Sequence, residues 1–435
     1  MLIDLLDTHG GDWIFTAPIG TPGTGPVSVG AGVRLHPVDL DERLRSQHYD
    51  TISINLILGM LHYLHDTATQ PVFDQAMVEA WVGYETVNRI YAKRLAELVE
   101  DVDDELILIN DPHLMLVPEH LAEARPRTSG KLAYFLGTPW CEPDYFGLMP
   151  EWTRVRLLES LLHCDVVGFH SGRWVDAFLA CCARNLPDAR ISGRVVRYRG
   201  RTTTLVSVPF PLDVDVLEQM RGEEATLRWA GRLAELAGGR RTVVRADRLD
   251  LWKNLPRGFL AYEALLERDP ALAEECLFVS VVTTPSRAAP RHQAYQDATE
   301  AIVDRVNRRF GAPGRDAIAL VRPGSGGDSR NAVVAALCSA SAAIVNSTYD
   351  GLNLFAKEAA YLLAEDSPLL VSANAGVHEQ LAGLATTVDP FDIDQTSRLL
   401  EAALRGTGRA AGRAERHALL RAESTTGWLA GVFGS

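Results

Sequence analysis

The chain has 435 residues, of which 47% are hydrophobic and 23% charged, and its formal net charge is −13. This length is enough for two domains that each bury a core, and the composition is ordinary for a globular protein. The acidic balance argues against nucleic acid and anionic membranes as main partners, because both require a basic surface.

The cysteines and the N-terminal residues bear on whether the protein binds a metal, is secreted or spans a membrane. The six cysteines form no CxxC pair and no His-Cys array with metal spacing, so we expect buried, reduced thiols and no bound metal. The N-terminal residues show no basic region followed by an apolar run. No apolar stretch approaches the ~20 residues of a membrane span. A cytoplasmic protein is therefore expected.

Short apolar runs alternate with helical patterns along most of the chain. The clearest helix is predicted from Phe73 to Glu100, with one buried face formed by Trp81, Tyr84, Val87, Tyr91 and Leu95. Apolar runs without polar alternation are typical of parallel strands covered on both faces. The predicted strands are Leu106–Ile109, Leu132–Leu136, Val166–Phe169, Leu205–Val208, Val243–Arg245, Leu277–Val282, Ala342–Val345 and Leu369–Ser372.

The pattern predicts an α/β protein with two Rossmann-like domains, mostly parallel sheets and a central cleft. The expected domains are residues 1–209 and 210–405, because Pro209 and Pro211 mark a stiff connection after a predicted hairpin. A helical segment, 406–435, is expected to cross back to the first domain. Ligands of such sheets bind at the carboxyl ends of the strands.

The stretch from Thr242 to Asn254 is interpreted as a strand that enters a polar turn. It places Arg248 and Lys253 after the strand, where two cations suit a diphosphate whose charge grows as a bond to it breaks. The alternative is a solvated ion-pair cluster of Asp247, Arg248 and Asp250. Lysine usage favours the first interpretation, because the chain has only four lysines and Lys253 is one of two that lie in these motifs.

The stretch at residues 342–358 also predicts a strand, a tight polar turn and a helix. Such a turn presents backbone N–H groups and a positive helix end to an anion. Glu358, in the first turns of that helix, could reach a ribose hydroxyl pair. A plain capped turn beginning at Asp350 and Gly351 is the alternative.

An ordered set of motifs makes the chain resemble the trehalose-6-phosphate synthase family of retaining glycosyltransferases and the related valienyltransferase-type pseudoglycosyltransferases. Each motif alone is weak, but their order over most of the chain is specific. The motifs are Trp81…Tyr84…Val87-Asn88, residues 110–118 (NDPHLMLVP), 135–140 (FLGTPW), 168–171 (GFHS), 246–250 (ADRLD), 285–287 (PSR) and 350–354 (DGLNL).

The resemblance implies a two-domain GT-B fold and transfer of a sugar from a nucleotide diphosphate donor to a phosphorylated acceptor, with retention and without a metal. It implies that Arg248 and Lys253 hold the diphosphate and that Asp111 faces the sugars. The other positions it implies are, for the donor, Asp350, Gly351, Asn353, Leu354, Glu358 and Gly137, and, for the acceptor, Tyr49, Arg287 and His113. Purely structural roles remain open for Asp111 as a helix cap, for His113 and Tyr49, and for Arg287 as a surface ion-pair partner.

Departures from the family pattern bear on the substrates. The family usually has His at the position of Gly137 and Trp at the position of Leu58, so neither glucose as donor sugar nor glucose 6-phosphate as acceptor is assured. The family's first strand and Gly-rich loop have no counterpart before Thr16, which favours a truncated start.

We therefore expect a retaining glycosyltransferase that uses a UDP- or GDP-linked sugar as co-substrate and needs no other cofactor. Its expected acceptor is a phosphorylated sugar or an aminocyclitol, in the biosynthesis of an aminoglycoside or aminocyclitol antibiotic. The alternatives are a pseudoglycosyltransferase that joins cyclitols through nitrogen and a catalytically degenerate regulator or scaffold. The oligomeric state is left open.

Overall fold

The computed structural model describes residues 2–17, 26–29, 32–99, 105–125, 130–283, 290–324, 326–408 and 410–434. The chain forms two compact units. The first unit comprises Met1–Phe210 and Thr425–Ser435, and the second comprises Pro211–Ser424. The change of unit after Phe210 lies within the proline-flanked segment that the sequence singled out.

The main sheet of the first unit has six strands in the order β4-β5-β6-β9-β8-β7. Strands β4, β5, β6 and β9 are parallel, and the hairpin strands β8 and β7 extend the sheet in antiparallel fashion. Their bounds are Leu106–Asn110 (β4), Lys131–Leu136 (β5), Val166–Phe169 (β6), Arg190–Ser192 (β7), Val195–Tyr198 (β8) and Arg201–Ser207 (β9).

The chain opens with α1 (Leu2–His9) and a separate three-stranded sheet in the order β1-β3-β2. Its strands are Gly11–Thr16 (β1), Val27–Val29 (β2) and Val33–Val38 (β3). The other helices of this unit are α2 (Glu42–Arg45), the π-helix η1 (Ser46–Leu58), α3 (Gly59–Leu61), α4 (Gln75–Leu98), η2 (Pro112–Leu114), α5 (Val117–Ala124), α6 (Pro143–Phe146), α7 (Glu151–Leu161), α8 (Gly172–Asn185) and α18 (Thr425–Phe433).

Helix α4 confirms the predicted buried stripe. Asp74 caps its first turn by accepting a hydrogen bond from the Met77 N–H. Trp81, Tyr84, Val87 and Tyr91 are buried and Leu95 is partly buried, and the helix packs mainly against η1 and α5.

The second unit is built on a parallel sheet of six strands in the order β12-β11-β10-β13-β14-β15. The order reverses between β10 and β13, which is the switch point at which doubly wound sheets bind ligands. The strands are Arg241–Arg248 (β10), Cys276–Thr283 (β11), Ile318–Val321 (β12), Ala342–Val345 (β13), Leu369–Ser372 (β14) and Thr386–Val388 (β15).

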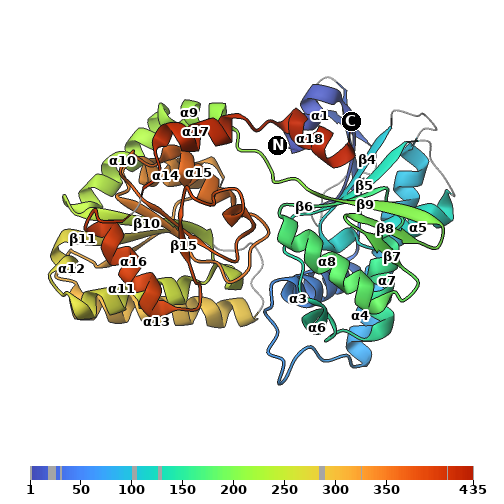
Figure 1. Cartoon of the computed structure of the whole chain (residues 1–435), viewed down its shortest axis with the longest axis horizontal. Coiled ribbons are helices and arrows are strands. Elements are labelled where there is room, and N and C mark those ends of the chain that lie inside the picture. The colour runs from blue at the N-terminus through green and yellow to red at the C-terminus, as the bar shows by residue number, and fades with distance from the viewer. Residues whose placement is uncertain are drawn as a thin grey trace. The chain divides into compact units, whose positions relative to one another are not determined.

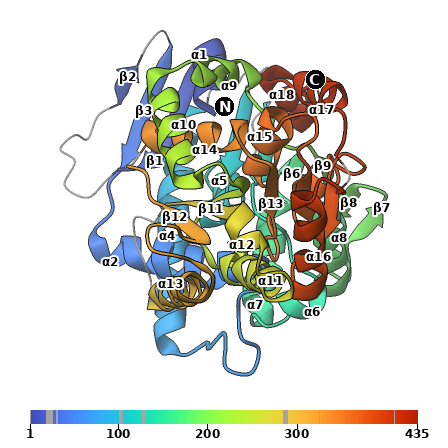
Figure 2. The ribbon, with the colours of Figure 1, turned by 90° about the vertical axis from the view of Figure 1, so that its left-hand side faces the viewer.

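Helices cover both faces of this second sheet (Figures 1 and 2). One face carries α11 (Leu255–Arg268), α13 (Pro290–Phe310) and α16 (Ile393–Leu404), with α12 (Leu272–Glu275) nearby. The other carries α9 (Val214–Arg221), α10 (Glu224–Ala237), α14 (Gly327–Cys338), α15 (Leu354–Leu362) and α17 (Arg413–Arg421). Short 3-10 turns, η3 (Leu251–Lys253) and η4 (Gly376–His378), follow β10 and β14.

The C-terminal segment, which was predicted to return to the first domain from residue 406, is divided between the two units at Thr425. Helix α17 belongs to the second unit, because the Arg416 guanidinium donates to the carbonyls of Leu363 and Ala364 and the His417 ring stacks on Tyr361. Only α18 belongs to the first unit, where Trp428 donates to the Val208 carbonyl at 3.2 Å.

Candidate active site

Two polar turns meet at the switch point of the second unit. Lys253 ends η3, just after β10, and Asp350 lies in the turn after β13. Because β10 and β13 are adjacent and parallel, their carboxyl ends deliver both residues to one edge of the sheet. The Lys253 Nζ lies 2.6 Å from Asp350 Oδ2. The two motifs that the sequence singled out therefore form one cluster.

The electrostatics of Lys253 favour its charged form. Burial lowers the pKa of this ammonium, but the carboxylates of Asp350 and Asp247 more than reverse that effect, and the net shift is upward. Lys253 is therefore a permanent cation at neutral pH, which suits the binding of a phosphate group.

Asn353 shapes the turn that begins α15. It has a positive φ of 80°, its side chain accepts a hydrogen bond from the Ala356 N–H at 3.1 Å, and its amide donates to Asp350 at 3.0 Å. Asparagine tolerates this left-handed conformation better than most residues. The turn leads directly into the first N–H groups of α15, beginning at Leu354, where the helix end favours an anion.

Reciprocal hydrogen bonds join the two turns. The Asn254 amide donates to the Asn346 carbonyl at 2.8 Å, and the Asn346 amide donates to the Asn254 carbonyl at 3.1 Å. The Thr348 N–H also donates to the Trp252 carbonyl at 2.8 Å. The position of Lys253 relative to Asp350 is therefore set by the backbone.

Arg248 ends β10 and lies at the edge of a cavity of about 170 Å³. Its side chain is 64% exposed and forms an ion pair with Asp250 at 2.8 Å. The ion-pair interpretation is thus realised for Arg248 and Asp250, whereas Asp247 pairs with Arg245 instead. An exposed guanidinium has five N–H donors, so one ion pair leaves donors for a phosphate.

Glu358 lines the same cavity from α15. Burial raises the pKa of its carboxyl, and Arg330, 4.0 Å away, partly offsets the effect. The cavity is lined by Ala246, Asp247, Arg248, Val281, Thr283, Ser329, Val333, Phe355 and Glu358. A mixed polar and apolar wall of this kind suits a nucleoside better than a purely ionic ligand.

In the first unit, Asp111 follows β4 in a strained conformation, with φ 69° and ψ 161°. That region is essentially restricted to glycine and costs roughly 1–3 kcal/mol for other residues. The Tyr134 hydroxyl donates to the Asp111 carbonyl at 2.5 Å, and the Gly137 N–H bonds the Asp111 carboxylate. Desolvation raises the pKa of the Asp111 carboxyl, and the hydrogen bond from the Gly137 N–H lowers it in part. The Asp111 side chain makes no capping hydrogen bond to η2, so the helix-cap interpretation is not realised.

Helix α4 holds the strained turn in place. The Tyr84 hydroxyl donates to the Pro112 carbonyl at 2.7 Å and accepts from the Met115 N–H at 3.1 Å. The Asn88 amide donates to the His113 carbonyl at 3.1 Å, and its oxygen accepts from the Leu116 N–H at 3.0 Å. The buried stripe of α4 thus has a second task, which sequence reasoning missed because it treated Tyr84 as core.

The predicted acceptor residues His113 and Tyr49 lie near each other, with ring centroids 6.4 Å apart. Tyr49 lies on the π-helix η1 and is exposed, as a ligand-contacting residue requires. Burial lowers the pKa of His113 to about 4, so its ring is neutral at pH 7. Arg287, the third predicted acceptor residue, lies outside the described residues.

Gly137 lies close to the Asp111 carboxylate. A Cβ at this position would lie 3.3 Å from Asp111 Oδ1 and 3.7 Å from His170 Nε2. A side chain at this position would therefore contact Asp111 and His170.

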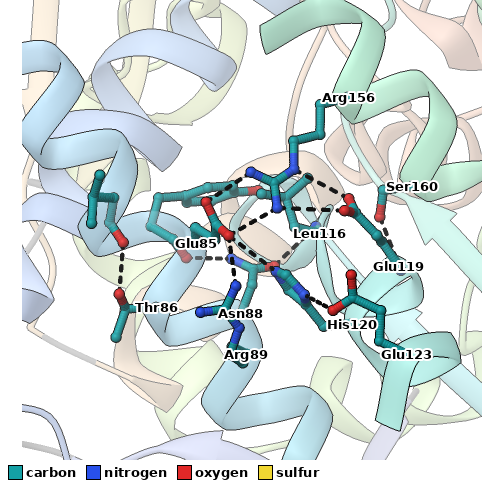
Figure 3. Close-up of polar contacts among 12 residues, drawn as sticks. Glu85, Thr86, Asn88, Arg89, Leu116, Glu119, His120, Glu123, Arg156 and Ser160 are labelled. Atoms are coloured by element: carbon teal, nitrogen blue, oxygen red, sulfur yellow. Dashed lines mark hydrogen bonds and ion pairs between the residues drawn. The ribbon is translucent and has the colours of Figure 1, made fainter. Parts of the chain in front are cut away.

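A charged cluster elsewhere in the first unit has the composition of a metal-ligand set. Glu119, His120 and Glu123 bring ligand atoms within 4.8 Å of one another. Figure 3 shows Arg156 pointing between Glu119 and Glu85. Its guanidinium lies 2.7 Å from Glu85 and 3.3 Å from Glu119, so an arginine already supplies the positive charge that these carboxylates need. The cluster is therefore an ion-pair network. That the reaction needs no metal stays a prediction.

The sequence profile of glycosyltransferase family 20 matches residues 27–427. The chain belongs to glycosyltransferase family 20. Among curated relatives of this family member, the alpha,alpha-trehalose-phosphate synthase [UDP-forming] of Botryotinia fuckeliana is 30% identical over 372 residues. The match covers 83% of this chain and 66% of that relative.

Solved structures of the family have the same fold. The alpha,alpha-trehalose-phosphate synthase (UDP-forming) from Burkholderia vietnamiensis superimposes with a TM-score of 0.85 at 25% identity, covering 98% of this chain and 89% of that one. The corresponding protein from Burkholderia xenovorans gives 0.84 at 25% identity, covering 100% and 96%. The predicted GT-B fold class is thereby confirmed. Within the described residues of this family 20 member, no helix is both long and apolar enough to cross a membrane.

Proposed function

We propose that this family 20 member transfers a sugar from a UDP-linked donor to a phosphorylated sugar acceptor, with retention at the anomeric carbon. The observation that carries the proposal is the Lys253–Asp350 pair, 2.6 Å apart, at the switch point and beside the N-terminus of α15. A diphosphate placed there meets a cation, backbone N–H groups and the exposed guanidinium of Arg248.

The reaction needs a leaving-group site more than it needs acid–base carboxylates. As the C1–O bond to the diphosphate breaks, the departing UDP takes the electron pair, and Lys253 and Arg248 stabilise the growing negative charge. The acceptor hydroxyl forms the new bond to C1 on the same face, and its proton passes to the departing phosphate oxygen. Catalysis then consists mainly of positioning and charge stabilisation.

The donor assignment rests on the second unit. Glu358 lines the 170 Å³ cavity and is proposed to accept hydrogen bonds from ribose hydroxyls. Asp350, Gly351, Asn353 and Leu354, in the turn that begins α15, are proposed to bind the diphosphate. UDP is proposed in preference to GDP because the matched relatives are named as UDP-forming synthases.

The acceptor assignment rests on the first unit. Asp111 is proposed to bind sugar hydroxyls, and Tyr49, His113 and Arg287 to bind the phosphorylated end of the acceptor. The strained backbone of Asp111 supports a role beyond packing, because strain of this kind clusters at functional sites.

We further propose that the sugars differ from those of trehalose phosphate synthesis and belong to an aminoglycoside or aminocyclitol product. The absence of a side chain at Gly137 supports this, because even a Cβ there would lie 3.3 Å from Asp111 Oδ1 and would change the surroundings of Asp111 and His170. Leu58 at the end of η1 supports it as well, since an aliphatic wall offers no ring for a sugar to stack on.

Calorimetry with UDP and GDP, followed by turnover assays, tests the proposal. The donors would be UDP-glucose, UDP-N-acetylglucosamine and GDP-glucose, with glucose 6-phosphate and an aminocyclitol phosphate as acceptors. UDP binding and release of UDP with an α-configured product would support it. A folded protein that binds neither nucleotide would contradict the enzyme assignment and favour a scaffold, and a C–N bond in the product would assign the pseudoglycosyltransferase activity.

A further inference from the structure

The diphosphate turn comprises residues 350–354, and Arg245 is a buried arginine next to it. It lies on β10 after two buried valines, and its side chain is only 1% exposed. Its Nε and Nη2 donate to Asp247 Oδ2 at 2.9 and 2.7 Å. Its Nη2 also donates to the Lys253 carbonyl at 2.8 Å, and its Nη1 donates to Asn346 Oδ1 at 2.9 Å. One guanidinium therefore links β10, η3 and the end of β13.

The fold leaves room for this side chain at Gly258 on α11. A Cβ at Gly258 would lie 2.6 Å from Arg245 Nη1, which is closer than two such atoms can approach. The guanidinium also lies 5.9 Å from the centre of the Phe259 ring, within reach of a cation–π contact. Arg245 is thus built into the site by its neighbours.

Arg245 pairs with one of the carboxylates that surround Lys253. Three carboxylates act on the Lys253 ammonium, namely Asp350, Asp247 and Asp250. Arg245 pairs with Asp247, and Arg248 pairs with Asp250. Lys253 is therefore left to Asp350, whose carboxylate lies in the diphosphate turn. Without Arg245, the buried Asp247 carboxylate would turn to Lys253 for its counter-charge.

We infer that Arg245 is a positioning residue for the donor diphosphate. It neutralises Asp247, which would otherwise take Lys253 as its counter-ion, and it holds the Lys253 backbone, so that the ammonium faces the diphosphate turn. Arg245 itself does not touch the diphosphate, since it is buried behind Lys253 and Asp247. The inference rests on the proposed function, because it takes the ligand of Lys253 to be a nucleoside diphosphate.

Arg245→Met, with Arg240→Met as the matched control, tests the inference with UDP as the probe. Arg240 is a second buried arginine, just before β10 at the opposite end of the strand, where its guanidinium donates to the Asp316 carbonyl. Both variants should lower Tm. Only Arg245→Met should weaken UDP binding in calorimetry, about tenfold or more, and reduce kcat/KM for the donor on the order of 10²-fold, as misplacement by about 1 Å does. The KM for the acceptor should stay unchanged.

The double variant R245M/D247N separates positioning from general support of the fold. With residue 247 uncharged, it no longer competes with the ligand for Lys253, so UDP affinity should recover most of the loss seen in R245M. Arg245→Lys, which keeps the charge but cannot bridge three partners, should fall between wild type and R245M and serves if R245M does not fold. Wild-type affinity in a folded R245M or R245K, or no recovery in the double variant, would overturn the inference. Wild type that binds no UDP would instead show that the proposed function is wrong.

Discussion

The Lys253 ammonium lies 2.6 Å from the Asp350 carboxylate, across the point where the strand order of the second sheet reverses. Each residue follows a different strand, and the pair brings the cation of one turn to the backbone amides of the other. An arriving diphosphate would share the ammonium with Asp350.

Replacing Lys253 by methionine should remove the buried cation while preserving most of the side-chain volume. We expect kcat to fall on the order of 10²–10³-fold, as when one donor to a developing anion is lost. Stopped-assay measurement of UDP release would detect the loss, and Lys93→Met, at an exposed position on α4, is the control. Undiminished turnover in Lys253→Met would remove Lys253 from the reaction.

Arg248→Ala should also reduce kcat, on the order of 10²-fold. Tm should fall as well, because the Asp250 carboxylate is only 7% exposed and would lose the guanidinium that pairs with it. Arg248→Lys should recover part of the rate, since a lysine keeps the charge without the guanidinium fork. Equal rates for the alanine variant and wild type would restrict Arg248 to its ion pair with Asp250.

Asp111→Gly and Asp111→Ala together measure the strain in the first unit. Both should abolish the contribution of the carboxylate to turnover. Glycine adopts φ 69° and ψ 161° without penalty, whereas alanine does not, so the glycine variant should be more stable by about 1 kcal/mol despite its larger chain entropy. Chemical denaturation gives the two free energies of unfolding. A more stable alanine variant would mean that the turn is unstrained.

The pH dependence of stability should report on His48. This histidine is buried, its Nε2 lies 2.8 Å from the His113 carbonyl oxygen, and burial lowers its pKa from 6.5 to about 4. The unfolded chain therefore binds more protons than the folded chain between these values. The stabilising effect is complete above pH 6.5 and is lost as the pH falls towards 4, by on the order of 3 kcal/mol.

His48→Gln should flatten that part of the stability curve, because glutamine does not titrate. Denaturation at pH 4.5, 5.5 and 7 would compare the variant with wild type. Curves that stay parallel over this range would assign the acid sensitivity to other groups.

Much of the fold could be predicted because strands buried on both faces consist of consecutive apolar residues. Strands β6, β13 and β14 have the predicted bounds, and most of the others differ by a few residues at their ends. Strands β12 and β15 were missed, because each is short, lies at an edge of its sheet and is only partly buried. The small β1-β3-β2 sheet was missed as well, since its exposed residues carry no strong apolar pattern.

The candidate site was predicted less completely than the fold. Lys253, Asp350 and Asn353 stood out because they follow apolar strands in polar turns. Arg245 did not stand out, since an arginine inside a strand is normally taken to face solvent. The support that Tyr84 gives to the Asp111 turn could not be predicted either, because a tyrosine at helical spacing is usually core.

Hydrophobic runs and ordered motifs are local properties, so they predicted a two-domain α/β protein of a glycosyltransferase family without coordinates. The pairing of the charges could be seen only in the folded chain, where Asp247 pairs with Arg245, Arg248 with Asp250 and Lys253 with Asp350. The choice among several nearby partners depends on burial and on distances of a few ångströms, and these are set by how the strands are ordered in the sheet and not by their spacing along the chain.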